Sequence, residues 1–174
     1  MSISMYQASV PVFIRMLNNL SDFLKKGEAY AEASNINPEV LINCRLYPNM
    51  FPLSRQIQIV SDAAKGCGAR LAGLEPPPYE DNEKTFSDLY DRINKTIAFL
   101  NTLTPGQVDG SEEKMINLDL RNYKLAIKGM PFLLNFSMPH FYFHVTTAYD
   151  ILRHNGVVLA KEDFLGKPDK QVMA

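Results

Sequence analysis

Residues 137–156 read SMPHFYFHVTTAYDILRHNG, and this segment decides the fold. The spacing predicts one helix in which His140 and His144 lie a single turn apart on the same face. Thr147 and Ile151 continue that narrow stripe, which is typical of a helix facing the core of a bundle. We expect the first residue, Ser137, to cap this helix and its final glycine to end it.

The histidine pair has two chemical interpretations. Neutral imidazole is a good ligand for zinc, nickel, iron or manganese, but a usable metal site needs at least three protein ligands. Two histidines at this spacing can also simply be hydrogen-bonded residues at the end of a bundle. The zinc-protease motif is excluded, because it requires glutamate directly after the first histidine, where this chain has Phe141.

The composition fits one domain of ordinary size, and we expect it to span residues 1–166, followed by a loose tail at 167–174. Of the 174 residues, 46% are hydrophobic, enough for a sizeable core. The 18 basic and 19 acidic residues give a formal net charge of −1, which argues against nucleic-acid binding. No apolar run approaches the roughly 20 residues that cross a bilayer, and no signal peptide is evident. We therefore expect a cytoplasmic protein with no membrane partner.

The two cysteines, Cys44 and Cys67, are expected to be reduced and structural, because they form no CxxC pair. The sequence also contains no serine nucleophile elbow, no phosphate-binding glycine loop and no dinucleotide fingerprint. These patterns exclude the commonest hydrolase, nucleotide-binding and dehydrogenase motifs.

Helical periodicity extends over the first half of the chain. One helix is predicted over residues 4–26, with Gly27 interrupting or ending it. Asn37 and Pro38 begin a short helix that breaks at Tyr47, so the second helix of the bundle resumes over residues 50–69. The clearest core seam lies on this helix: Leu53, Ile57, Val60, Ala64, Cys67 and Leu71.

The third helix of the bundle is predicted over residues 82–103, after an extended connector with three prolines at 76–78. Its charged residues are expected on a solvated face: Asp88, Asp91, Arg92 and Lys95. Residues 123–127 and 132–136 predict a small β-hairpin. The connection of about thirty residues before the last helix excludes a simple up-down-up-down topology with short loops. The sequence thus predicts a mainly α four-helix bundle with a broken second helix and a β-hairpin in the long crossover before the last helix.

The last predicted helix resembles the final helix of DinB/YfiT-like bundles, which show a His-x-x-x-His motif, an Arg-Gly-Gln-like turn, and then a Leu-Arg pair and a helix-ending glycine. This chain matches those positions with His140, His144, Leu152, Arg153 and Gly156. Further stretches extend the resemblance over most of the chain: RLYPNMFPLSRQIQIVSDAAK (45–65), ARLAG (69–73) and KEDFLG (161–166). The whole pattern is similar to a domain-of-unknown-function family within that superfamily.

The resemblance implies a four-helix bundle with a pocket at one end. Many members of the superfamily hold a divalent metal there with three histidines, several are metal-dependent thiol transferases or hydrolases, and dimers are common. His140 and His144 match two of the three ligands. The third ligand belongs on the second helix of the bundle, but the chain has no histidine before His140.

The helical wheel suggests which residue replaces the missing ligand. Gln56 flanks the apolar seam and is the residue expected to face the histidine pair, and Asn49 flanks the same seam if the helix extends that far. The amide of Gln56 could act as a weak metal ligand, or as a hydrogen-bond donor that orients His140 or His144 in a metal-free site. The predicted pocket comprises Gln56, His140, His144, Phe143, Thr147 and Asn49.

Three functions stay open at this point. A divalent ion on His140 and His144, helped by Gln56 and waters, would activate a bound water or thiol as a nucleophile. A non-catalytic bundle would instead use an aromatic-lined pocket to bind a small organic molecule. A structural homodimer could form through exposed apolar parts of the first helix or the hairpin.

Overall fold

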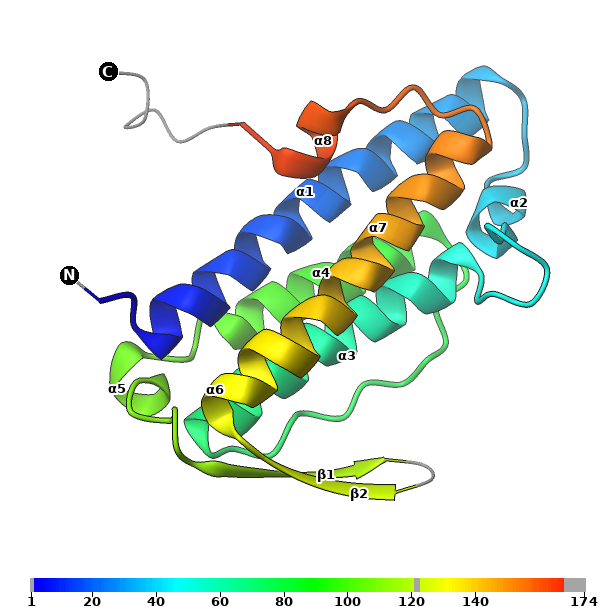
Figure 1. The fold of residues 1–174 in the computed structure, drawn as a ribbon. Coiled ribbons are helices and arrows are strands. Elements are labelled where there is room, and N and C mark those ends of the chain that lie inside the picture. Colours follow the sequence, from blue (N-terminus) through cyan, green and yellow to red (C-terminus); the bar gives the residue numbers. More distant parts are fainter. Residues whose placement is uncertain (1, 121–122, 168–174) are drawn as a thin grey trace.

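Four long helices form the bundle, as predicted (Figure 1). The computed structural model describes residues 2–120 and 123–167. The long helices are α1 (Met5–Ala33), α3 (Leu53–Ala72), α4 (Phe86–Leu100) and α7 (Met138–His154). Helix α7 packs mainly against α3, while α4 packs against both α3 and α1. The predicted mainly helical bundle with one small hairpin is therefore confirmed.

The core is built from the apolar seams of these helices. Every residue of the α3 seam is at most 1% exposed: Leu53, Ile57, Val60, Ala64, Cys67 and Leu71. Helix α1 contributes fully buried Phe13, Leu17, Leu20 and Leu24 to the same cluster. Each large apolar side chain buried in this way contributes about 1.5–3 kcal/mol relative to an exposed one.

Helix α1 continues past Gly27, so the prediction that this glycine interrupts or ends the helix is wrong. A Cβ atom at Gly27 would lie 2.9 Å from a terminal methyl carbon of Leu152. The glycine therefore allows α7 to approach α1 closely. At the other end of α1, Ser4 and Gln7 form a capping box.

The second helix of the bundle is broken, as expected. Helix α2 (Pro38–Asn43) is capped by Asn37, whose side chain accepts a hydrogen bond from the backbone N–H of Glu39 at 3.0 Å. Helix α3 begins at Leu53 and not at residue 50, because Pro52 occupies its N-cap position in extended geometry. Its C-terminal end is set by Gly73, whose φ of 78° lies in the left-handed region.

The long crossover contains the expected hairpin, but its strands differ from the prediction. Strands β1 (Met115–Leu120) and β2 (Tyr123–Lys128) pair antiparallel, with Leu118 opposite Leu125. Between α4 and β1 lies the short helix α5 (Pro105–Val108), and α6 (Gly129–Pro131) follows β2.

Residues 132–136, predicted as the second strand, belong instead to a π-helical turn, η1 (Phe132–Ser137), which leads directly into α7. Ser137 has helical backbone angles and makes no cap, so that prediction is also wrong. A short apolar run such as FLLNF fits a buried strand and a buried helical turn equally well by periodicity.

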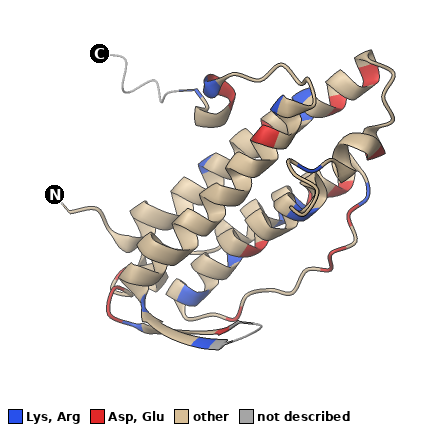
Figure 2. Cartoon of the chain, turned by 45° about the vertical axis from the view of Figure 1, so that its right-hand side comes forward, with Lys and Arg blue, Asp and Glu red and all other residues tan. Residues whose placement is uncertain are grey.

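Two peripheral segments cover the bundle. The extended connector of residues 74–85 runs between α3 and α4, and Figure 2 shows several acidic positions along it. The short helix α8 (Lys161–Leu165) packs on α1, and the ring of Phe164 meets Tyr149 of α7 edge-on at a centroid distance of 5.9 Å. The predicted tail at 167–174 lies outside the described residues, apart from its first residue. Among the described helices, none is long and apolar enough to span a membrane.

Candidate functional site

The π-helical turn and the start of α7 align three rings. Phe132 and Phe136 stack with centroids 6.0 Å apart and planes inclined by 20°, and Phe136 and His140 stack at 6.1 Å and 18°. We call Phe132, Phe136 and His140 the ring ladder. Phe132 is buried, Phe136 is half-buried and His140 is exposed, so the ladder runs from the core to the surface. π-Helical turns of this kind often occur at functional sites.

His144 is one turn further along α7 and is held by a chain of hydrogen bonds. Its Nδ1 lies 2.6 Å from Oε1 of Gln56, and Nε2 of Gln56 donates to the backbone carbonyl of Phe51 at 3.0 Å. Because the amide nitrogen of Gln56 is turned toward Phe51, its oxygen faces the histidine. Nδ1 of His144 therefore donates, and Nε2 remains as the acceptor nitrogen of the ring.

This environment keeps His144 neutral. Burial, the neighbouring His140 and the positive charge of Arg55 together lower its pKa to about 4 from the ordinary value of 6.5. The His144 side chain is only 7% exposed, and its ring meets that of His140 at a centroid distance of 4.7 Å. Partial burial also lowers the pKa of His140. Both rings are consequently neutral at pH 7.

A groove of about 570 Å³ lies beside the ring ladder, between α3 and the start of α7. The charged and aromatic side chains that line it are Arg55, Asp62, Arg70, Phe132, Phe136 and His140. The thiol of Cys67 also borders the groove, but burial raises its pKa to about 12. Cys67 is therefore protonated and a poor nucleophile at neutral pH.

The six predicted pocket residues lie in different environments. His140 lines the groove, whereas Gln56 and His144 are buried next to it. Phe143 is 57% exposed and packs its ring edge-on against His144. Thr147 is buried and donates its hydroxyl to the carbonyl of Phe143 at 2.8 Å. Asn49 is exposed in the loop before α3, because the helix does not extend to it.

The family described as Domain of unknown function (DUF1993) matches residues 5–165, nearly the whole chain. The chain belongs to the DUF1993 family. A similar solved structure is the crystal structure of a DinB family member from Shewanella denitrificans, which is 36% identical with a TM-score of 0.86. The match covers 94% of this chain and 92% of that one, and the comparison with curated proteins found no match.

This DUF1993 chain does not complete the three-histidine site that the DinB resemblance implies. Within residues 2–120 and 123–167, no three histidine, cysteine, aspartate or glutamate residues are grouped to hold an ion. Gln56 on α3 lies beside the pair, but its amide oxygen is the direct hydrogen-bond acceptor of His144. The donor set is a histidine pair with an orienting amide, fewer than the three protein ligands of ordinary zinc sites.

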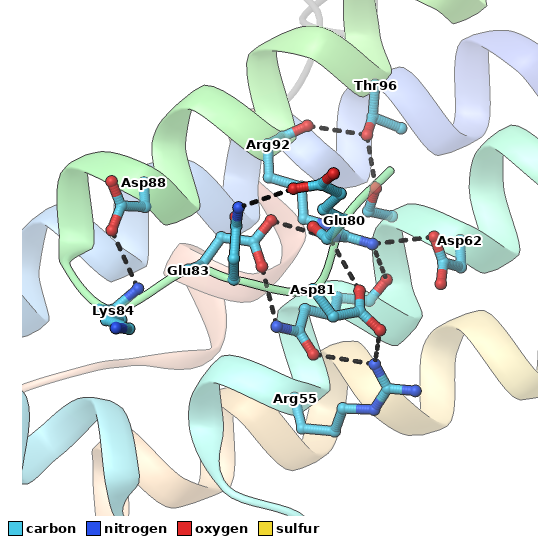
Figure 3. Close-up of polar contacts among 12 residues, drawn as sticks. Arg55, Asp62, Glu80, Asp81, Glu83, Lys84, Asp88, Arg92 and Thr96 are labelled. Atoms are coloured by element: carbon cyan, nitrogen blue, oxygen red, sulfur yellow. Dashed lines mark hydrogen bonds and ion pairs between the residues drawn. The ribbon is translucent and has the colours of Figure 1, made fainter. Parts of the chain in front are cut away.

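A second polar cluster in this DUF1993 chain was not predicted from the sequence. Arg92, assigned above to the solvated face of its helix, is only 3% exposed, so that prediction is wrong. Its guanidinium contacts Glu83 at 2.8 Å, Asp62 at 2.9 Å and Asp81 at 3.0 Å, and donates to the carbonyl of Glu80 at 3.0 Å (Figure 3). Three of these partners lie on the connector, which covers Arg92 and removes it from water.

Tyr79 strengthens the same attachment of the connector. Its ring lies 4.6 Å from the ammonium nitrogen of Lys65 and 4.4 Å from that of Lys95, while its hydroxyl donates to the carbonyl of Lys95 at 3.2 Å. The sequence signal that could have revealed this cluster is the group of three acidic residues at positions 80, 81 and 83, shortly after the three prolines. A stiff acidic connector can reach back to a basic residue on the next helix.

Proposed function

We propose that this chain binds a small organic molecule with a flat apolar part, in the groove between α3 and the ring ladder. The ring ladder is the observation that supports this proposal, because its near-parallel rings border a cavity of suitable size. Small-molecule sites usually have volumes of roughly 300–1,000 Å³ and walls of aromatic and apolar side chains with few polar groups. Binding requires no resident metal, since stacking and apolar burial supply the affinity.

The test is a calorimetric titration with 2-naphthamide, an uncharged flat molecule. Saturable binding is expected, weakened about fivefold in Phe136→Leu, because ring stacking contributes about 1 kcal/mol beyond the area buried. The matched control is Phe99→Leu, which alters another half-buried phenylalanine, on α4 and outside the groove. Absence of binding, or equal weakening in the two variants, would reject the proposal.

The alternative is a metal-dependent thiol transferase or hydrolase with a divalent ion on His140 and His144. One observation favours it: His144 donates through Nδ1 to an oxygen, the arrangement by which metal-binding histidines are usually oriented. Elemental analysis of untagged protein separates the two functions. Near-stoichiometric zinc, nickel, iron or manganese that is lost in His144→Gln supports the alternative. A content near zero that does not rise when these ions are added rejects it.

A further inference from the structure

Of the three charged side chains that line the groove, Arg70 alone has no ionic partner among the described residues. Arg55 forms an ion pair with Asp81. Asp62 accepts from Arg92 at 2.9 Å and pairs with Lys65 at 3.0 Å. Arg70 instead donates one hydrogen bond, at 3.0 Å, to the backbone carbonyl of Gly66. One positive charge in the groove is thus left without a counter-ion in the part of the chain that the structure describes.

Gly66 determines where this charge lies. A Cβ atom at Gly66 would be 2.5 Å from Nη1 of Arg70 and 3.8 Å from its Cζ, and it would meet no other side chain of the described residues within 4 Å beyond the adjacent positions. The guanidinium therefore occupies the space that a side chain at residue 66 would fill. Its bond to the Gly66 carbonyl fixes it there, while most of its five N–H donors stay available.

Arg70 also lies in the last turn of α3, where a positive charge offsets the negative end of the helix dipole. That role needs only the charge, and it is compatible with any orientation of the side chain. It does not require a glycine one turn earlier, which weakens a helix relative to alanine. The glycine and the folded-back guanidinium together indicate a further role.

We propose that the ligand of the groove is a flat aromatic carboxylate, whose carboxylate pairs with Arg70 while its ring stacks on the ring ladder. This inference rests on the function proposed above. A planar guanidinium matches a carboxylate with two parallel hydrogen bonds. A monoanion suits the groove better than phosphate, because a phosphate group carries about −1.5 to −2 charges at pH 7 and Asp62 borders the same groove.

The first test compares 2-naphthoate with uncharged 2-naphthamide by calorimetry. The wild-type chain should bind the carboxylate at least about tenfold more tightly than the amide, the effect of a hydrogen bond to a charged group. Arg70→Gln should remove this preference while leaving amide binding unchanged. The matched control is Arg153→Gln, which removes an exposed arginine from the last turn of α7, about 20 Å along that helix from His140. It should keep the preference.

Gly66→Ala tests the position of the guanidinium without changing any charge. The new methyl group should displace Arg70 and reduce the preference for the carboxylate severalfold. The alanine should also raise the thermal midpoint by about 2–4 °C, which separates this effect from unfolding. A raised midpoint with the preference retained would overturn the role of this position.

The outcomes distinguish the two proposals. If the wild-type chain binds neither molecule, both the groove function and the carboxylate inference are rejected. If it binds both molecules equally well, the groove function stands and the carboxylate inference falls. If Arg70→Gln and Arg153→Gln lose the preference to the same extent, long-range charge explains it, and a specific pairing with Arg70 is rejected.

Discussion

Protonation of His144 should make the folded chain sensitive to mild acid. The pKa of this side chain is about 4 in the folded state against an ordinary value of 6.5. At pH values between these two pKa values, His144 binds a proton in the unfolded chain but not in the folded chain, so the free energy of unfolding decreases as the pH falls. The slope is at most about 1.4 kcal/mol per pH unit. Lowering the pH from 7 to 5 should therefore cost about 2 kcal/mol through this residue, and about 3 kcal/mol is lost below pH 4.

The measurement is urea unfolding of the wild type and His144→Gln at pH 7 and at pH 5. In the variant, the difference between the two pH values should shrink by about 2 kcal/mol. His140 faces His144 and also has a lowered pKa, so part of the pH dependence should remain. Each protein is compared with itself, which cancels the cost of leaving Gln56 without its partner.

The matched control is His154→Gln, which removes the exposed histidine at the end of α7. It should not remove the loss of about 2 kcal/mol that His144→Gln removes. The reasoning would be refuted if His144→Gln kept the full pH dependence, or if the wild-type chain unfolded at the same urea concentration at both pH values.

Three further changes probe the rest of the molecule. Arg92→Leu should lower the free energy of unfolding by about 3–5 kcal/mol, because it leaves the buried carboxylate of Glu83 without its counter-ion. Lys95→Leu, at an exposed position, should lower it by about 1 kcal/mol or less, and urea unfolding measures both. Gly129→Ala should lower the free energy of unfolding by about 3 kcal/mol or more, because its Cβ would lie 1.9 Å from the backbone oxygen of Ser111. In Gly106→Ala the new Cβ meets nothing within 4 Å, so the free energy of unfolding should change by no more than about 0.5 kcal/mol. The thiol of Cys67 should stay unmodified by a disulfide reagent until the chain unfolds, and thiol titration with and without urea would show this.

The long helices, and the side of α3 on which Gln56 lies, could be predicted from the sequence because both depend on the helical spacing of apolar residues. Apolar residues at helical spacing must lie on one side of a helix, and the α3 seam is buried as that rule requires. The same wheel put Gln56 on the side of the histidines, and the structure brings it to 2.6 Å from His144. The structure differs from the prediction in one respect. The amide of Gln56 was expected to donate a hydrogen bond to a histidine, whereas its oxygen accepts one from His144.

The features that sequence reasoning missed depend on contacts between distant segments. Arg92 lies on the polar side of its own helix, and only the connector that folds over it turns this position into a buried one. Gly27 is predicted to interrupt or end its helix because glycine weakens a helix, whereas the structure uses it for close packing against Leu152, which is 125 positions later in the sequence. The π-helical turn at residues 132–137 has no distinguishing local pattern.

The attachment of the connector to Arg92 has a consequence for how the chain moves. Loops of this length are commonly the first parts of a protein to open, because few contacts hold them. If residues 79–83 moved away from the bundle, the almost fully enclosed guanidinium of Arg92 would lose most of its acidic partners at once. The backbone amides of α3 and α4 beneath the connector should therefore exchange their hydrogens with solvent slowly and together. The connector, although it has no regular secondary structure, should be among the last parts of the chain to open.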